Sequence, residues 1–453
     1  MLIAFNAKWL SLNQAGKLRQ HERIVYDRLG STNRYNHAIV SDDLYPLQPD
    51  KDAPFTRGPL AAVLWGAFLG CSWTWVIGMI LPALLLRDYG LYGWFVFAVP
   101  NVLGAALMGL VLFRPQWSVN IVRNHRVACQ NFTVITVAYH LFVIAWLFSK
   151  LFGLAAVPML VVAVGLCATF GLRNRNSAML FVSAAVAIVS WGCFSWATKA
   201  PGAWDLATWT WPTEGVNRLT KTDLLWFAPC ALFGFALCPY LDLTFHRARI
   251  NTSPGTGVGA FFIGFGLVFC SMIVFSICYG AKLLPFIHGE EDAKLEGIWL
   301  VLLAIHLTLQ AGFTVTVHVR EMMEDKKANI PWLVTLGGIA ILLGLFARIS
   351  VLPEHRITGG LTWGEAGYRL FLVFYGTVLP GYVFLVMVPR LRGPLSKVGN
   401  DIRIFIYSVV CGLSLAFAWV GFTMGQSHMI PILFAVFIAG RVAIELIPPG
   451  KAQ

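Results

Sequence analysis

Charge is scarce in this sequence. Asp, Glu, Lys and Arg make up 12% of its 453 residues and hydrophobic residues make up 57%, whereas soluble domains contain about 25% and roughly 45–50%. The mean hydropathy is +0.69. Several runs of about 20 residues carry few charges, which is long enough to cross roughly 30 Å of hydrocarbon as a helix. The composition therefore predicts an integral membrane protein.

Other features are also missing. The alternation of polar and apolar residues that marks a membrane β-barrel does not occur, so we expect helical spans, which satisfy their own backbone hydrogen bonds. Residues 1–57 contain no apolar core of the kind found in a cleavable signal peptide. The nine cysteines fall in or at the ends of apolar runs, and their positions indicate neither a disulfide framework nor a zinc finger.

Nucleotide and nucleic-acid motifs are lacking too. The glycine-rich segment 255–259 is not followed by the Gly-Lys of an ATP-binding loop. We therefore expect a protein that is not an enzyme. The net charge of +12 is assigned to loops that face anionic lipid, not to nucleic acid.

Twelve membrane spans are expected, and most of the Lys and Arg lie on the side of the N-terminus, which predicts that both ends are cytoplasmic. The expected spans are residues 60–87, 91–113, 128–150, 153–172, 177–198, 224–246, 256–284, 296–318, 331–352, 367–389, 403–423 and 428–447. The expected organisation is a cytoplasmic polar tail (1–57), a first block of five spans (58–199), a Trp-rich outer loop (200–222), a second block of five (223–390), and two peripheral spans with a short cytoplasmic C-terminus (391–453).

Two spans contain residues that interrupt helices. Span 1 contains Gly66 and Gly70, and span 6 contains Gly234 followed by Pro239. Proline removes a backbone donor, and glycine lowers the cost of leaving helical geometry. Each interrupted span opens a block of five, and five is an odd number, so the two blocks enter the membrane from opposite sides. The pattern predicts an all-α membrane protein with a 5+5 inverted repeat, broken helices 1 and 6 and two peripheral helices.

Span 1 carries a family resemblance. The segment Phe68 to Trp73, followed by Leu81-Pro82-Ala83 and by Tyr89-Gly90 up to Trp94, resembles the first core helices of the sodium:solute symporters. It also resembles related members of the amino acid–polyamine–organocation superfamily, which have the leucine-transporter-type fold. In those families a Gly/Ala/Ser-Trp break precedes a small-Pro motif and a Tyr-Gly turn. The resemblance implies a central substrate site beside the two broken helices.

The eighth span departs from the symporter pattern. Those symporters usually offer a small residue followed, three and four positions later, by paired hydroxyls for sodium. Here Thr314 follows Ala311, but Val315 occupies the second hydroxyl position. The alternative frame also contains a single hydroxyl, from Thr308. The coupling ion is therefore left open between a proton and sodium.

Polar groups inside lipid are costly, so each is a functional candidate. The expected substrate-binding residues are Gly70, Cys71, Ser72, Trp73, Trp75, Tyr139, His140, Cys238 and Tyr240. The expected residues for ion coupling or gating are Asp242, His306, Thr308, Gln310 and Thr314. A histidine titrates near neutral pH, as a proton-coupled cycle requires. The structural alternatives are packing for each histidine and a partnership of Asp242 with His246 or Arg249.

These observations favour a secondary transporter that moves a small solute by alternating access. Its expected partners are the lipid bilayer and the solute, with no resident cofactor or metal and with a homo-oligomer left open. Three alternatives remain: a metal-ion transporter with Cys71 and Cys238 as soft ligands, a membrane haem protein with His140 and His306 as ligands, and a sensor that keeps the fold without transport. The sequence does not identify the substrate.

Overall fold

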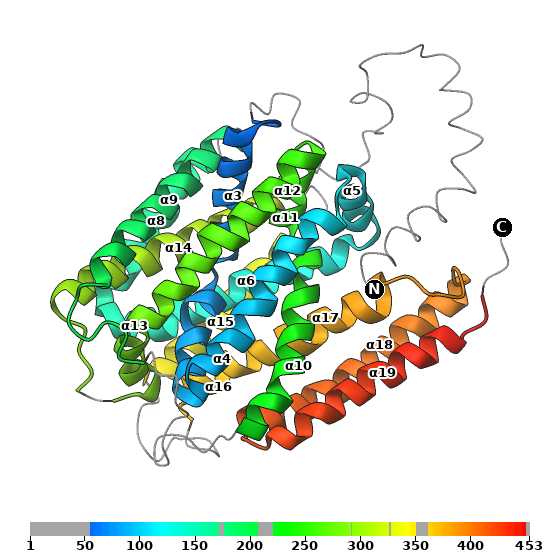
Figure 1. Cartoon of the computed structure of the whole chain (residues 1–453). Helices are drawn as coiled ribbons and strands as arrows, with labels where there is room; N and C mark the ends of the chain where they lie inside the picture. The colour runs from blue at the N-terminus through cyan, green and yellow to red at the C-terminus, as the bar shows by residue number, and fades with distance from the viewer. Residues whose placement is uncertain are drawn as a thin grey trace, which may run out of the picture. The chain divides into compact units, whose positions relative to one another are not determined.

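The structure is a computed structural model that describes residues 55–171, 176–206, 221–290, 292–325, 328–349 and 361–449. The chain divides into two units, Met1–Pro46 and Leu47–Gln453, and the described residues all belong to the second. Most of the polar tail and of the Trp-rich loop lies outside the described residues. Within those ranges the chain is almost entirely helical (Figure 1), which confirms the all-α prediction.

The described helices follow one another with short connections. In chain order they are α3 (Pro59–Trp73), α4 (Val76–Val111), α5 (Pro115–Asn124), α6 (Arg126–Val143), η1 (Ile144–Phe148), α7 (Ser149–Phe152), η2 (Gly153–Ala155), α8 (Ala156–Gly171), α9 (Asn176–Ala197), α10 (Lys221–Leu237), η3 (Cys238–Leu241), α11 (Leu243–Ile250), α12 (Pro254–Ile263), η4 (Gly264–Phe269), α13 (Cys270–His288), α14 (Gly297–Met323), α15 (Ile330–Ile349), α16 (Trp363–Val373), η6 (Phe374–Val378), α17 (Leu379–Tyr382), η7 (Val383–Met387), α18 (Lys397–Ala418), η8 (Trp419–Thr423), η9 (Ser427–Met429) and α19 (Ile430–Leu446).

The apolar helices account for the predicted spans. Among the described residues, ten continuous helices are long and apolar enough to cross a membrane, and two shorter apolar helices, Pro59–Trp73 and Ala156–Thr169, add to them. The chain is therefore a multi-pass membrane protein. Spans 1 and 2 share α4, which turns at Gly90 with φ 60° and ψ −158°. Only glycine adopts that backbone conformation readily.

The break in span 1 lies slightly later than the sequence indicated. α3 stays helical through Trp73, and Thr74 and Trp75 then take ψ angles of 65° and 174° before α4 begins. The backbone N–H and the hydroxyl of Thr74 both donate to the carbonyl of Gly70, at 3.0 and 2.7 Å. These bonds satisfy a carbonyl that the end of the helix would otherwise leave free. The break therefore lies at Thr74 and Trp75, and Gly70 stays inside the helix.

Gly70 has a packing role instead. A Cβ placed on it would lie 2.6 Å from Cβ of Val268 and 2.8 Å from the carbonyl oxygen of Gly264. Because real Cβ contacts are longer than this, the glycine allows α3 to approach η4 closely. Small residues allow this approach generally in membrane helices.

The break in span 6 overlaps the predicted one. α10 ends at Leu237, the turn η3 follows, and Asp242 is extended with ψ 114° before α11 begins. Pro239 is the second residue of η3, where its missing N–H costs little. Gly234 remains inside α10, and a Cβ placed on it would lie 3.2 Å from Cα of Gly376. Proline thus marks this break, whereas the glycine serves helix packing.

The helix contacts support the predicted repeat. α3 of span 1 packs on α12 of span 7, and α10 of span 6 packs on α4 of span 2. In the same way, α6 of span 3 packs on α15 of span 9, and α14 of span 8 packs on α8 of span 4. If each span of the first block is exchanged with its counterpart five places later, the pair of spans 1 and 7 becomes the pair of spans 6 and 2. The pair of spans 3 and 9 becomes the pair of spans 8 and 4 in the same way, as an inverted repeat requires.

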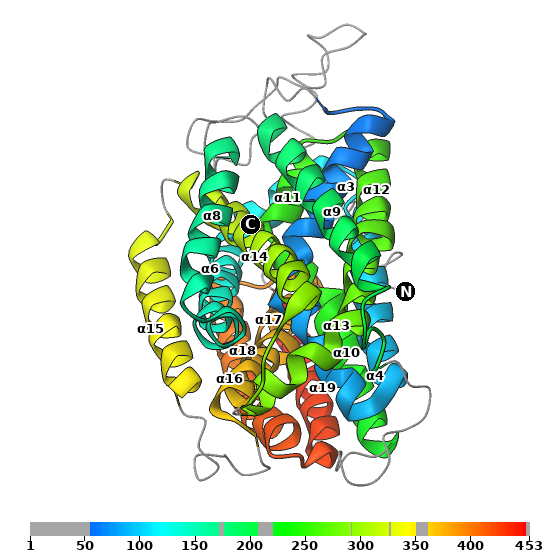
Figure 2. The same ribbon diagram turned by 90° about the vertical axis from the view of Figure 1, so that its left-hand side faces the viewer.

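The last two spans pack beside the second block. α18 and α19 lie side by side (Figure 1), and they share an apolar cluster with η7 and the end of α16 that includes Val373, Leu385, Val410 and Phe437. In Figure 2 α15 lies at the edge of the described unit, next to α6. Inside the bundle, helices of spans 1, 3, 6 and 8 contact one another, since α14 packs on α3 and α6, and α11 packs on all three.

Candidate functional site

The two interrupted spans meet at their breaks. The hydroxyl oxygens of Thr244 at the start of α11 and Ser72 at the end of α3 lie 3.2 Å apart. The ring of Trp73 lies 4.8 Å from the ring of Phe245, and its Nε1 donates to Oδ1 of Asn101 at 2.7 Å. All five side chains are buried. The predicted contact between the breaks is therefore present.

One group of predicted residues gathers where α3, α9 and α14 meet. Nε2 of Gln310 donates to Oγ of Ser190 at 2.9 Å, and Nδ1 of His306 lies 3.1 Å from the same oxygen. Gln310 also approaches Sγ of Cys71 at 3.9 Å. Among the described residues, Nε2 of His306 and Oε1 of Gln310 have no hydrogen-bond partner. We call these four residues the Cys71 cluster.

Thr314 lies next to this cluster. Its hydroxyl donates to the carbonyl of Cys71 at 3.2 Å, and the hydroxyl oxygen keeps its lone pairs as acceptors. The neighbouring Val315 packs on an apolar cluster with Val134 and Met322. Thr308 is buried elsewhere on the same helix. The single hydroxyl therefore holds α14 against α3.

A second polar group forms between the breaks, α6 and α14. Oδ1 of Asp242 accepts hydrogen bonds from the backbone N–H and the hydroxyl of Thr244, both at 2.8 Å, so the carboxylate caps α11. Oδ2 lies 3.9 Å from Nε2 of His318. The ring of Trp75 lies 5.5 Å from the ring of His318 and 6.4 Å from that of His140. We call Asp242, Thr244, His318, His140 and Trp75 the Asp242 cluster.

Several atoms of the Asp242 cluster are unpaired. Asp242 and His318 are completely buried and His140 nearly so. In the described part of the chain, Oδ2 of Asp242, both ring nitrogens of His318 and Nε2 of His140 have no hydrogen-bond partner. Nδ1 of His140 lies 2.7 Å from the carbonyl of Thr136, so it carries the proton and leaves Nε2 as an acceptor. Such atoms are rare in protein interiors, because each costs free energy.

The structure contradicts the partners that the sequence suggested for Asp242. Nε2 of His246 lies 3.0 Å from the carbonyl of Tyr240. The guanidinium of Arg249 bonds the carbonyls of Leu112 and Phe113. Both side chains are therefore engaged elsewhere, because helix α11 turns them away from the carboxylate. His318 takes their place, and sequence reasoning missed it because its partner lies on a different helix.

The remaining predicted residues lie apart from the two clusters. The hydroxyl of Tyr139 donates to the carbonyl of Tyr368 at 2.6 Å, and Sγ of Cys238 donates to the carbonyl of Tyr375 at 3.1 Å. Tyr240 is half-buried. His306 packs against the ring of Phe275 at 4.7 Å, whereas His140 packs against Trp75. The two histidines therefore belong to different clusters.

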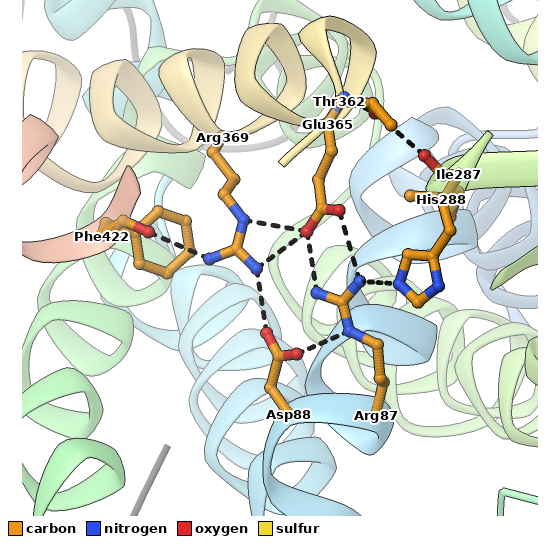
Figure 3. Close-up of polar contacts among 8 residues, drawn as sticks. All are labelled: Arg87, Asp88, Ile287, His288, Thr362, Glu365, Arg369 and Phe422. Atoms are coloured by element: carbon orange, nitrogen blue, oxygen red, sulfur yellow. Dashed lines mark hydrogen bonds and ion pairs between the residues drawn. The ribbon is translucent and has the colours of Figure 1, made fainter. Parts of the chain in front are cut away.

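A network of buried charges joins α4 and α16 (Figure 3). Nη2 of Arg87 donates to Oε1 of Glu365 at 2.8 Å and its Nε to Oδ1 of Asp88 at 2.6 Å. Nη2 of Arg369 bonds Oδ2 of Asp88 at 3.0 Å and Oε1 of Glu365 at 2.9 Å. Nη1 of Arg87 lies 2.6 Å from Nε2 of His288 on α13. We call this the Arg87 network; within it Glu365 and Arg369 lie four residues apart and share one face of α16.

A second charged network joins α11 and α14. Arg247 bonds both oxygens of Glu321, at 3.0 Å from its Nη2 to Oε2, and it also bonds Glu324. Nε of Arg320 donates to Glu324 at 2.8 Å. Each network lies on the C-terminal side of a break, with Arg87 after the break in span 1 and Arg247 after the break in span 6.

These features define an α-helical multi-pass membrane protein in which two interrupted spans meet inside the bundle. No protein-family model matches the sequence, and no curated protein is similar to it. The structure is similar to that of a Na⁺-coupled sialic acid symporter solved in a substrate-bound, outward-open state, with a TM-score of 0.51 and 14% identity over 88% of this chain and 92% of the other. A manganese transporter from Eremococcus coleocola has a TM-score of 0.48 and 12% identity over 89% and 99%. The first similarity shows that the chain has a transporter-type fold.

Proposed function

We propose that this protein is a secondary active transporter that moves a small solute across the membrane by alternating access, coupled to an ion. The observation that carries the proposal is the contact of the two helix breaks at Ser72 and Thr244. An interrupted helix frees backbone groups in the middle of the bilayer, where they can bind a solute or an ion. A protein without a ligand at that depth would gain nothing from two such breaks.

The two charged networks fit the same proposal. The Arg87 network joins spans 1 and 10, and the Arg247 network joins spans 6 and 8. Each consists of paired buried charges, which lose much free energy when one partner is removed but separate at moderate cost when water enters. An alternating-access cycle needs two gates, one on each side of the substrate site, and only one gate is open at a time. In the proposed cycle, the conformation with both networks formed would be the occluded step.

The proposed orientation follows the distribution of basic residues. With both ends in the cytoplasm, the Arg87 network faces outside and the Arg247 network faces the cytoplasm. The outer closure would then contain His288, and the inner one would join Arg247 in the second half of α11 to the C-terminal end of α14.

We also propose that the protein is related to the sodium:solute symporters. The segment Phe68–Trp73 with its later Tyr89-Gly90 turn resembles the sodium:solute symporters, and Gly90 does form the turn between spans 1 and 2. The missing second hydroxyl at Val315 argues against sodium at the usual place. The proposed coupling ion is therefore a proton.

The test starts from ligand discovery. Purified protein is screened by thermal shift against amino acids, nucleobases, osmolytes, sialic acid and divalent metals, because a ligand that binds the folded state alone raises its stability. The stabilising solute is then followed into proteoliposomes under a proton gradient or a sodium gradient. We expect accumulation under one gradient and none without it. Binding with no flux or exchange in either direction would contradict transport and would favour the sensor alternative.

A further inference from the structure

The Asp242 cluster contains unpaired polar atoms that the capping of α11 does not explain. To cap α11, Asp242 needs one oxygen, and Thr244 occupies it with two hydrogen bonds. The other oxygen is buried, points toward His318 at 3.9 Å and has no hydrogen-bond partner among the described residues. His318 itself has two unpaired ring nitrogens. A leucine at 318 would avoid this loss, so a ligand for these atoms is the economical explanation.

We propose that Asp242 and His318 form a proton-binding site, with His140 as the next acceptor. The inference rests on the proposed function, since it names the ion that drives the cycle and the residues that bind it. The residues come from the break in span 6 and from spans 3 and 8, and Thr244 connects Asp242 to Ser72 of span 1. A change at this site can therefore reach all four spans.

The charge balance explains how a proton would control the cycle. With one proton bound, the pair is neutral overall, whether Asp242 is a carboxylic acid beside a neutral imidazole or a carboxylate beside an imidazolium. Without it, a buried carboxylate faces a neutral ring, and this charge is costly unless water reaches it. The occluded conformation is therefore favoured when the proton is bound. Loading takes a proton from water on the open side onto a lone pair of the carboxylate or imidazole, and release breaks the same O–H or N–H bond on the other side.

Other titratable groups face the pair from each neighbouring helix. Glu321 on α14 acts on Asp242 but is engaged by Arg247. Cys129 on α6 and Tyr375 on η6 also lie close enough to interact with the carboxylate. From α6 His140 acts on His318, and its free Nε2 is an acceptor. None of these groups pairs directly with Oδ2 of Asp242 in the described part of the chain.

Two features separate this site from the Cys71 cluster. Oγ of Ser190 lies within hydrogen-bond distance of Nδ1 of His306, so this ring has a polar partner that His318 lacks. No carboxylate belongs to that cluster. His306 is thus a matched control: it is a completely buried histidine on the same helix, with no acidic partner in its cluster.

The experiment follows protonated carboxyl groups by infrared absorption in the purified full-length protein. The pH is varied from about 4 to about 9, which spans the ordinary pKa values of carboxyl groups and histidine. Asp242→Asn should remove one titrating carboxyl band, and Asn still caps α11 because it is as good an N-cap as Asp. His318→Gln should move the midpoint of that band upward by at least about one pH unit, or tenfold in proton affinity, because the imidazole no longer takes the first proton. His306→Gln should leave the band unchanged.

Each outcome decides the inference. A full set of titrating bands in Asp242→Asn, or an unchanged midpoint in His318→Gln, would overturn it. So would loss of the band when sodium replaces potassium at constant pH, because sodium would then be the ligand. The titration needs no solute and no flux, so its failure is distinct from a failure of transport. Uptake driven by another ion, without titration of Asp242, would reject the proton site and leave the proposed function standing.

Discussion

The hydroxyls of Thr244 and Ser72 lie 3.2 Å apart and connect the two interrupted spans directly. The hydroxyl of Thr244 is also 2.8 Å from Oδ1 of Asp242. One small side chain thus holds α3 against α11 and fixes the carboxylate that caps α11. The contact couples the position of one break to that of the other, which is why substitutions here inform both stability and function.

Thr244→Val should destabilise the protein. It removes one of the two hydrogen bonds to Oδ1 of Asp242 and the contact with Ser72, whose hydroxyl also bonds the carbonyl of Leu69 at 3.0 Å. A buried polar group that loses a hydrogen-bond partner costs about 1–3 kcal/mol. The control is Thr316→Val, because the hydroxyl of Thr316 bonds the carbonyl of Gly312 within its own helix at 2.8 Å. Thermal unfolding in detergent measures both. Equal losses in the two variants would show that the contact between the breaks has no special role.

Gly70→Ala should separate α3 from η4. The added Cβ would lie 2.6 Å from Cβ of Val268 and 2.8 Å from the carbonyl oxygen of Gly264, so one of the helices must move, at a typical cost of about 1–3 kcal/mol. Gly192→Ala is the matched control, since nothing lies within 4 Å of its Cβ position and alanine favours a helix. We expect a lower melting temperature for the first variant and an equal or higher one for the second. A neutral Gly70→Ala would contradict close packing at this position.

Arg87→Gln should break the Arg87 network. Removing one partner of a buried ion pair typically costs about 3–5 kcal/mol, because the remaining charge stays buried. Lys282→Gln is the control, since Lys282 pairs with Asp205 at 3.8 Å in a partly exposed position, where such pairs contribute about 0–1 kcal/mol. Melting temperatures should fall clearly in the first variant and little in the second. A similar small loss in both would show that the network contributes little to closure.

His125 should make stability depend on pH. It lies between α5 and α6, outside the spans, 3.2 Å from the hydroxyl of Tyr382. Burial, together with the nearby Arg403, lowers its pKa to about 4. The unfolded histidine therefore takes up a proton below its ordinary pKa of about 6.5 while the folded one does not, and stability is lost as the pH falls from about 6.5 to about 4.

The measurement compares melting temperatures over that pH range. His125→Gln should flatten the pH dependence, whereas the exposed His428→Gln should leave it as in the wild type. If His125→Gln retains the full acid sensitivity, another group is responsible.

Single cysteines should establish the orientation. In a background without the nine native cysteines, which are free thiols, a cysteine at Asp205 or Glu290 should react with an impermeant reagent from outside. A cysteine at the exposed Arg123 should react only after the membrane is opened. The reverse pattern would invert the topology and exchange the inner and outer assignments of the two charged networks.

The sequence by itself determined the membrane spans and the two interrupted helices. Span length is a local property, since it depends on the number of consecutive apolar residues that cover the bilayer. The break in span 6 is equally local, because Pro239 cannot donate a helical hydrogen bond. The pair of Glu365 and Arg369 also followed from spacing alone, since residues four apart share a face of a helix.

Only the tertiary structure decided which polar residues meet. His306 and His318 lie on the same helix and look alike in sequence, yet His306 contacts Ser190 on α9 and His318 faces Asp242. Which helix packs against each face of α14 depends on contacts between segments far apart in the chain, and no local pattern records them. For the same reason the close packing of Gly70 against η4 and the pairing of Arg87 with Glu365 become visible only in the structure.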